Sequence, residues 1–356
     1  MEFGCARWVY NYFLNLRQEH YKETGKNLTY NMMSAELTKL RKLPEVSWLK
    51  ESSFNALQQS LRNLNTAYSK FFKGQCRYPQ FKKKSNRHSI THASDYNVKV
   101  NQGFLSIPKV KNIKCVYSRE IVGQTKSITV SRTPSGKYYV SIRAIIQQAE
   151  PEYSGNQIGI DLGLKDFLTI SDGEKVPSPS FLRKNEKTLA RHQRKLSRKK
   201  KGSANRTKQR KKVAAVHEKI ANQRNDFLHK LSSRLVSENQ AIGLEDLNVA
   251  GMKRNHSLAK SVSDASWSEF IRQLTYKGEW YGCHIQTVDR WFPSSKTCSS
   301  CGSVKDALQL SERSWECPDC NTVHDRDINA AINILNNTAG SAEINAYGDR
   351  VSQDAA

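Results

Sequence analysis

Apolar residues recur along the chain with a period that changes twice, and the changes divide it into three parts. Residues 5 to about 75 repeat their apolar positions every three or four residues, which predicts a packed helical bundle. Residues 96–107 and 127–142 instead predict two β-hairpins, with turns at Asn-Gln-Gly and Pro-Ser-Gly. The predicted helical face consists of Phe54, Leu57, Leu61, Leu64 and Tyr68.

Beyond Gly155 the pattern changes to short, uninterrupted apolar runs. Residues 157–163 (QIGIDLG) and 240–247 (QAIGLEDL) are typical of central strands in a mixed α/β sheet, and each run leads to a carboxylate, Asp161 or Glu245. Near the C-terminus, Asp327 is expected to open a helix. Its predicted apolar face is Ile328, Ala331, Ile332 and Leu335. Residues 341–356 show no pattern and are expected to form a tail.

The net charge points to a polyanionic partner. Lys and Arg number 57 against 33 Asp and Glu, a formal charge of +24 over 356 residues. No apolar run approaches the roughly 20 residues needed to cross a bilayer, and the N-terminus has no secretory signal pattern. We therefore expect a protein that is neither secreted nor bound to a membrane, with no membrane partner.

More than half of the excess charge lies in one short segment. Residues 183–212 hold fifteen Lys or Arg and one acid, Glu186, and residues 183–230 predict two helices broken at residues 202–205. Although charge runs are usually only solvated, this density favours neutralisation of nucleic-acid phosphates. The candidate contacts are Arg191, Arg194, Lys195, Arg198, Lys199, Lys200, Lys201, Lys208, Arg210 and Lys211.

Four of the eight cysteines have the spacing of a zinc ribbon. Two Cys-x2-Cys pairs, separated by fifteen residues, would close a tetrahedral structural Zn2+ site. Gly302 and Asn321 follow the pairs, where a sharp turn favours a left-handed backbone. We expect His284 and His324 not to be ligands, because four thiolates already fill the site. The expected ligands are Cys298, Cys301, Cys317 and Cys320.

Three acids form a candidate catalytic site. Asp161 and Glu245 follow buried strands and Asp327 lies at a helix N-terminus, so the three carboxylates could meet and hold two Mg2+ (or Mn2+) ions for phosphodiester hydrolysis. Each acid alone is more simply a turn, surface or capping residue. Spacing also leaves alternatives open: Asp325, Asp246, Asp166 and Asp172.

Several segments, in their order along the chain, resemble the TnpB family, OrfB-type proteins of bacterial insertion sequences that are related to type V CRISPR effectors. The resembling residues are 159–173, 196–230, 242–252, 291–304 and 315–335. The resemblance matches Asp161, Glu245 and Asp327 to the family's three catalytic acids and favours Asp327 over Asp325. Family members begin with a further strand and helix, so we expect a wedge strand to be missing, and Asn321 replaces a usual glycine.

The resemblance implies an α/β RNase H-like (RuvC) nuclease fold with an inserted zinc ribbon, beside an N-terminal helical recognition lobe and a small β-barrel-like wedge. It implies a protein of the bacterial or archaeal cytoplasm, associated with the nucleoid, that binds a guide RNA and cuts the paired target DNA. We expect a monomer or a dimer. The expected divisions are a lobe at 1–80, a wedge at 81–150, RuvC parts at 151–182, 231–290 and 325–340, bridging helices at 183–230, a ribbon at 291–324 and a tail at 341–356.

Three other functions are compatible with these features. A guided DNA-binding protein or repressor would bind without cutting, and the short N-terminus favours this alternative. A transposase or a transposition accessory protein would act in strand transfer. If the chain were a plain zinc-ribbon RNA-binding protein, the three acids would have no shared role and their positions at strand ends would be a coincidence.

Overall fold

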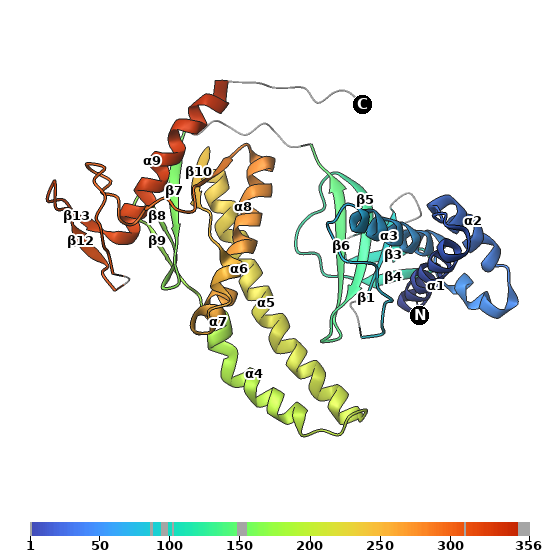
Figure 1. The fold of residues 1–356 in the computed structure, drawn as a ribbon. Helices are drawn as coiled ribbons and strands as arrows, with labels where there is room; N and C mark the ends of the chain where they lie inside the picture. The colour runs from blue at the N-terminus through green and yellow to red at the C-terminus, as the bar shows by residue number, and fades with distance from the viewer. Residues whose placement is uncertain are drawn as a thin grey trace. The chain divides into compact units, whose positions relative to one another are not determined.

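A computed structural model describes residues 2–85, 88–93, 99–101, 103–147, 155–309 and 311–347. For residues 99–101 and 339–347 it describes the backbone only. The chain separates into two compact units, Met1–Gln148 and Ala149–Ala356 (Figure 1). No helix within the described residues is both long and apolar enough to span a membrane.

The first unit begins with helices, as the apolar period predicts. They are α1 (Glu2–Thr24), α2 (Tyr30–Leu40), the 3-10 helix η1 (Pro44–Glu51) and α3 (Phe54–Phe72). Gly25 in the left-handed region (φ 66°) follows α1, and the Thr29 side chain caps α2. The predicted face of α3 is confirmed: Leu57, Leu61 and Leu64 are fully buried, Tyr68 is nearly so, and Phe54 packs against them at the rim.

Two antiparallel sheets complete the first unit. Strands β1 (His88–Ala93), β5 (Gln124–Arg132) and β6 (Tyr138–Ile145) form one, in the order β1-β5-β6. The other consists of β2 (Lys99–Asn101), β3 (Phe104–Ile107) and β4 (Val110–Lys114). Both predicted hairpins are present, although residues 96–98 of the first lie outside the described residues.

The second unit is built on a mixed five-stranded sheet in the order β11-β10-β7-β8-β9. The strands are β7 (Gln157–Leu162), β8 (Asp166–Ile170), β9 (Lys175–Pro177), β10 (Ala241–Glu245) and β11 (His284–Val288). Strand β10 pairs in parallel with β7 and β11, while β7, β8 and β9 pair antiparallel. The prediction of two central strands from 157–163 and 240–247 is confirmed.

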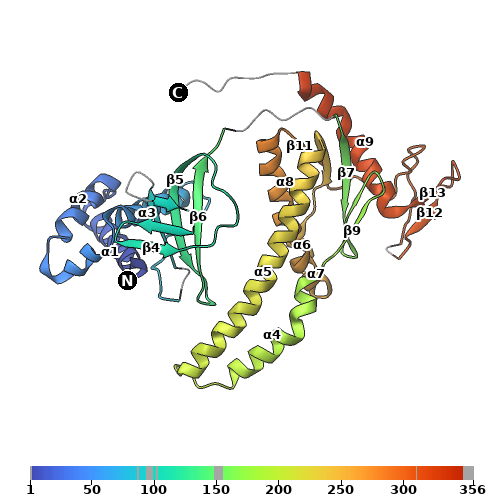
Figure 2. The same cartoon turned by 180° about the vertical axis from the view of Figure 1, so that it is seen from behind.

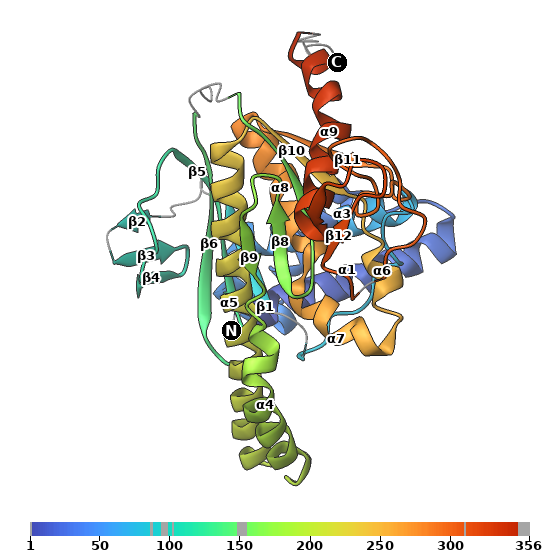
Figure 3. The same ribbon diagram turned by 90° about the vertical axis from the view of Figure 1, so that its left-hand side faces the viewer.

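Helices cover both faces of this sheet (Figures 1 and 2). On one face, Ile158, Ile160 and Leu162 of β7 share a core with α5 (Ala204–Glu238) and α8 (Trp267–Tyr281). On the other face lies α9 (Arg326–Tyr347). Helix α4 (Phe181–Ser197) packs beside α5, and both extend away from the sheet (Figure 3). The short helices α6 (Val249–Met252) and α7 (His256–Ala265) precede α8.

One sequence expectation about the last segment is wrong, and another is right only in part. Helix α9 continues to Tyr347, so residues 341–347 are helical rather than a tail. The face of α9 that is buried is also turned from the predicted one: Ala330, Ala331 and Ile334 are fully buried, whereas Ile328 and Ile332 are half-buried. The face is shifted rather than replaced, because Ala331 and Leu335 of the predicted set lie against Gly159 while Ile334, which was not in the set, lies against Gly243.

Candidate active site

Two of the candidate acids lie on adjacent parallel strands. Asp161 is the penultimate residue of β7, and Glu245 is the last residue of β10. Leu244 pairs with Ile160, so the next residues along the two strands, Glu245 and Asp161, lie side by side. Both acids are half-buried. Because the strands run parallel, the carboxyl ends that carry the acids are at the same edge of the sheet.

Glycines two positions before each acid let α9 approach the sheet closely. A Cβ atom on Gly159 would lie 2.0 Å from the carbonyl oxygen of Ala331, and one on Gly243 would lie 2.4 Å from Oγ1 of Thr338. Residues two apart on a strand point to the same face, so α9 covers the face that carries the acids. The glycine in each of the segments Ile-Gly-Ile-Asp and Ile-Gly-Leu-Glu could therefore have predicted that a helix packs closely on this face, which the sequence analysis missed.

The start of α9 gives different roles to Asp325 and Asp327. Asp325 Oδ1 accepts hydrogen bonds from the backbone N–H groups of Asp327 and Ile328, both at 3.1 Å, which makes Asp325 the cap of α9. Its Oδ2 pairs with Nζ of Lys175 at 2.7 Å. Among the described residues, Asp327 has a looser contact, with its Oδ1 3.4 Å from Nη1 of Arg313. Arg313, which the sequence analysis missed, therefore faces the third acid.

The electrostatics of Asp161 indicate that the three acids share one environment. Burial raises the pKa of Asp161 to about 8, with further increases from the negative charges of Glu245 and Asp327. Arg326 and Arg313 partly oppose this shift. A buried carboxylate whose charged form is opposed by two neighbouring carboxylates marks a site suited to cations, because a bound cation would offset this repulsion.

The alternative acids have other partners or positions. Asp246 forms an ion pair with Arg290, and Asp172 accepts a hydrogen bond from the backbone N–H of Glu174 at 2.8 Å in the β8–β9 turn. Asp166 begins β8, which pairs antiparallel with β7, so it lies toward the same sheet edge as Asp161, but the charges that raise the pKa of Asp161 are those of Glu245 and Asp327. Asp325 serves as the cap of α9. The geometry therefore favours Asp161, Glu245 and Asp327 as the group that converges.

The four predicted cysteine ligands come together. Their sulfur atoms all lie within 4.8 Å of one another, and Cys298–Cys320 and Cys301–Cys317 are each separated by 3.6 Å. A tetrahedral zinc ion with Zn–S bonds of about 2.3 Å would set sulfur atoms about 3.8 Å apart, so the four thiols fit this ion. They are the only such group of ligand atoms among the described residues.

Two knuckles and a small hairpin hold the cysteine cluster. Gly302 (φ 80°) and Asn321 (φ 55°) are both left-handed, which confirms the predicted turn after each Cys pair. Strands β12 (Ser314–Glu316) and β13 (Val323–Asp325) pair antiparallel beside them. Because β13 ends at Asp325, the cap of α9, the cysteine cluster is joined directly to the helix that carries Asp327.

The two neighbouring histidines lie outside this group of four. His324 is buried, with Nε2 at 3.0 Å from the Cys298 sulfur, a distance that fits a hydrogen bond to a thiolate. His284 opens β11, where it pairs with Ala241 of the sheet. That neither histidine is a ligand stays a prediction.

The basic segment forms a helical hairpin, α4 and α5. The break between its helices lies at residues 198–203, because the Ser203 side chain caps α5 and Ala204 and Asn205 are already helical, contrary to the sequence prediction. Arg206 is used internally, since its guanidinium donates to the carbonyl oxygens of Leu196 and Lys199. All ten predicted contact residues are exposed, and none forms an ion pair with a described residue.

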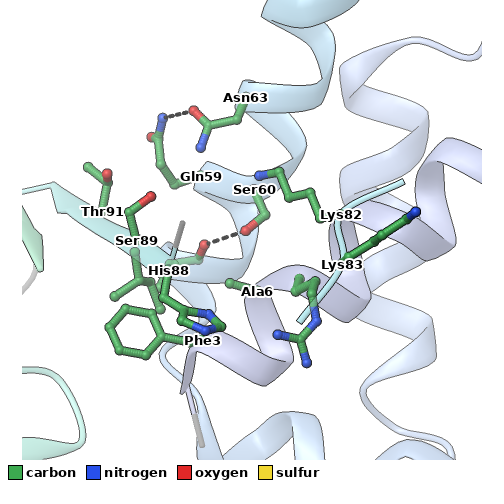
Figure 4. Close-up of a pocket in the computed structure, with 13 residues that line it drawn as sticks. Phe3, Ala6, Gln59, Ser60, Asn63, Lys82, Lys83, His88, Ser89 and Thr91 are labelled. Carbon is green, nitrogen blue, oxygen red and sulfur yellow. Dashed lines mark hydrogen bonds between the residues drawn. The ribbon is translucent and has the colours of Figure 1, made fainter. Parts of the chain in front are cut away.

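The first unit contains a small polar pocket. It lies between α1, α3 and β1 and is lined by Gln59, Asn63, Lys82 and His88, among other residues (Figure 4). Its volume of about 40 Å3 suits only a few water molecules. It is therefore too small for a nucleotide.

Three family models match successive parts of the chain. A helix-turn-helix domain of OrfB from IS605 matches residues 2–26, a segment that forms the single helix α1 here. The OrfB family of IS605, described as "Probable transposase", matches residues 137–256. A Cas12f1-like TNB domain matches residues 267–334, which include the cysteine cluster and Asp327.

Two full-length relatives are similar to almost the whole chain. A protein of Streptomyces pristinaespiralis named "Putative RNA-guided DNA endonuclease" is 40% identical over 352 residues, covering 98% of this chain and 87% of the relative. InsQ of Escherichia coli K12, with the same designation, is 32% identical over 364 residues, covering 98% and 89%. The similarity thus extends through both compact units.

A solved structure has a similar fold. It is the Cas12f1 chain in a complex with its sgRNA and target DNA, with a TM-score of 0.58 and 16% sequence identity. The alignment covers 93% of this chain and 80% of the Cas12f1 chain.

Proposed function

The chain belongs to the OrfB family of IS605, also known as the TnpB family, and from this membership we propose that it is an RNA-guided, Mg2+-dependent DNA endonuclease. The observation that carries the proposal is the convergence of Asp161, Glu245 and Asp327 from three separate segments, expressed in the raised pKa of Asp161. A binding protein would have no use for three mutually repelling acids at one sheet edge.

The proposed site would hold two divalent cations. Asp161, Glu245 and Asp327 supply the hard oxygen ligands that Mg2+ prefers. Hydrolysis of a phosphodiester commonly uses two such ions about 4 Å apart, one for the attacking and one for the leaving oxygen. Bound Mg2+ or Mn2+ would supply the activation of water and the stabilisation of the leaving oxygen in phosphodiester hydrolysis.

The chain's own residues would bind and orient the substrate. Arg313 beside Asp327 and Lys175 beside Asp325 place positive charge at the margin of the acids, where a phosphate oxygen would need it. The exposed α4–α5 hairpin would neutralise further phosphates of the guide RNA or target DNA. An enzyme with these partners would work in the bacterial or archaeal cytoplasm beside the nucleoid.

In this proposal each part of the chain has a distinct role. Residues 151–182, 231–290 and 325–347 form an RNase H-like (RuvC) nuclease, and residues 183–230 are its bridging helices. Residues 1–80 act as a recognition lobe and 81–150 as a wedge, and the two together hold the nucleic acid. The mixed sheet with α9 over the acids supports the nuclease assignment.

The test is guided cleavage by the purified protein. We would prepare it with RNA from the 3′ end of its own gene and incubate it with a plasmid library that has randomised flanks, with Mg2+ or with EDTA. We expect cuts that require Mg2+ and follow the guide. Guided binding without cuts would contradict the nuclease and support a repressor.

Paired acid substitutions test the site itself. Asp161→Ala and Asp327→Asn should abolish cleavage while nucleic-acid binding stays within about twofold, because only the metal ligands are lost. Asp325→Asn is the matched control: asparagine also caps helices, and a surface ion pair such as that with Lys175 contributes about 0–1 kcal/mol. Cleavage by Asp161→Ala, or loss of cleavage in Asp325→Asn alone, would show that the acids are wrongly assigned.

We further propose that the cysteines hold one structural Zn2+ ion. Cys317→Ser should lower the zinc content measured by atomic absorption and reduce the melting temperature, because a bound ion contributes to folding. Cys283→Ser is the control, since this buried cysteine lies outside the cluster and its loss should leave zinc unchanged. Unchanged zinc in Cys317→Ser would rule out this site.

A further inference from the structure

The segment that leads into the cysteine cluster is fastened to α9 by two buried asparagines. The Asn333 amide group donates to the carbonyl oxygens of Ser294 (2.8 Å) and Thr297 (2.6 Å), and the Asn329 amide group donates to Thr297 (2.7 Å). Asn329 Oδ1 also accepts from the backbone N–H of Ser299 at 2.9 Å. Asn329 and Asn333 are 1% and 5% exposed, so these bonds are shielded from water and fix the backbone of the segment.

The fixed segment presents one hydroxyl group to the candidate active site. Ser294 is 4% exposed, and its Oγ donates a hydrogen bond to Oε1 of Glu245, which lies 49 residues earlier at the end of β10. No described residue donates a hydrogen bond to the other oxygen, Oε2. Glu245 therefore has one carboxylate oxygen held by the protein and one left for a ligand.

We propose that Ser294 is a positioning residue for Glu245. Its hydroxyl fixes Oε1, so that Oε2 is presented to the space shared with Asp161 and Asp327, and Asn329 and Asn333 hold Ser294 in place. The inference rests on the proposed function, in which Glu245 is a metal-holding acid. Helix α9 then serves the site twice: it supplies Asp327, and through its asparagines it orients an acid on another strand.

The reason to expect a measurable effect is the freedom of the glutamate side chain. Rotation about the terminal bond of a glutamate is soft, so its oxygens are poorly defined unless a partner holds one of them. Partners that orient metal ligands typically change metal affinity by roughly 10–100-fold when removed. Ser294 has the burial and the supporting bonds that such a partner needs.

The test is Mn2+ affinity, measured by electron paramagnetic resonance of free Mn2+ on the zinc-loaded, full-length protein, with Asp161→Ala as the background. We expect Ser294→Ala to weaken Mn2+ binding about tenfold while zinc content is unchanged. The Mg2+ concentration for half-maximal cleavage should rise by a similar factor. Ser294→Thr keeps the hydroxyl and should keep the affinity.

Ser295→Ala is the matched control, because the neighbouring Ser295 is half-buried and its hydroxyl has no hydrogen bond to a described residue. It should bind Mn2+ like the wild type. The proposal is overturned if Ser294→Ala binds Mn2+ as tightly as wild type, if Ser294→Thr loses as much affinity, or if Ser294→Ala also loses zinc. If the wild type itself binds no more Mn2+ than Asp161→Ala, the proposed function fails together with the positioning role.

Discussion

At the scale of single residues, the proton affinity of Asp161 links the candidate site to pH. In protein without divalent cations, burial and the charges of Glu245 and Asp327 raise the pKa of Asp161 to about 8. Between about pH 4 and pH 8 the native state therefore keeps a proton that the unfolded chain releases. Because the native state binds more protons in this window, its stability falls as pH rises, and the fall ends above about pH 8.

Asp161→Asn should remove this pH dependence. With EDTA present, we expect its melting temperature to exceed that of wild type by an amount that grows from pH 5 to pH 8 and then stays constant. Asp325→Asn is the control, because the pKa of Asp325 is shifted in the opposite direction. Burial raises this pKa, but the hydrogen bond from Lys175 and those from the α9 backbone lower it overall. Its difference from wild type should be constant over this range. A constant difference for Asp161→Asn as well would contradict the raised pKa.

The residue scale also shows what sequence spacing cannot separate. Asp325 and Asp327 differ by two positions, and both precede an apolar helical pattern, so spacing leaves either as a candidate acid. The structure separates them because Asp325 accepts hydrogen bonds from the free N–H groups at the start of α9, whereas Asp327 lies in the first turn of the helix itself. Arg313 and Ser294 were not predicted, since their partners lie 14 and 49 residues away and no local pattern marks them.

At the scale of elements, the contact between α9 and β7 sets the distance between Asp327 and Asp161. In Gly159→Ala the new Cβ would meet backbone atoms, Ala331 O at 2.0 Å and Leu335 N at 2.5 Å, so α9 would have to move away from the strand. We expect the free energy of unfolding to fall by about 1–3 kcal/mol. Cleavage should fall further than nucleic-acid binding, as measured by denaturant titration and by plasmid cleavage.

Gly4→Ala is the matched control for this prediction. A Cβ on Gly4 in α1 would have no atom within 4 Å, so the substitution should be neutral or slightly stabilising. If Gly159→Ala cleaves DNA like wild type at unchanged stability, α9 does not depend on this close approach.

Elements were predictable where the local pattern alone determines them. The two central strands, the β5–β6 hairpin and the left-handed knuckle residues Gly302 and Asn321 follow from period and turn chemistry. The buried face of α9 followed only in part, because it depends on which residues of the sheet are glycine. The end of the helix at Tyr347, past the expected tail, was missed because that stretch carries few large apolar residues.

At the scale of the whole molecule, acidic and basic residues gather in different parts of the second unit. The second unit has acids that converge on one sheet edge, whereas the α4–α5 hairpin of the same unit carries a net charge of +14 over residues 183–212. Of the basic residues there, Arg206 closes the hairpin and the ten predicted contacts face solvent without ion pairs to described residues. Such unpaired charges are what phosphate binding requires.

This separation predicts the salt dependence of binding. Neutralising Lys199, Lys200 and Lys201 to glutamine should weaken binding to a random-sequence DNA duplex and lower the slope of log K against log salt by about 3, since each phosphate contact contributes about 0.9. The control makes the same charge change at Lys39, Lys230 and Lys260, which are already paired with acids, and should alter the slope by less than about 1. Fluorescence anisotropy between low and moderate salt measures both. Equal changes in the two triple variants would mean that net charge, rather than the hairpin, attracts the nucleic acid.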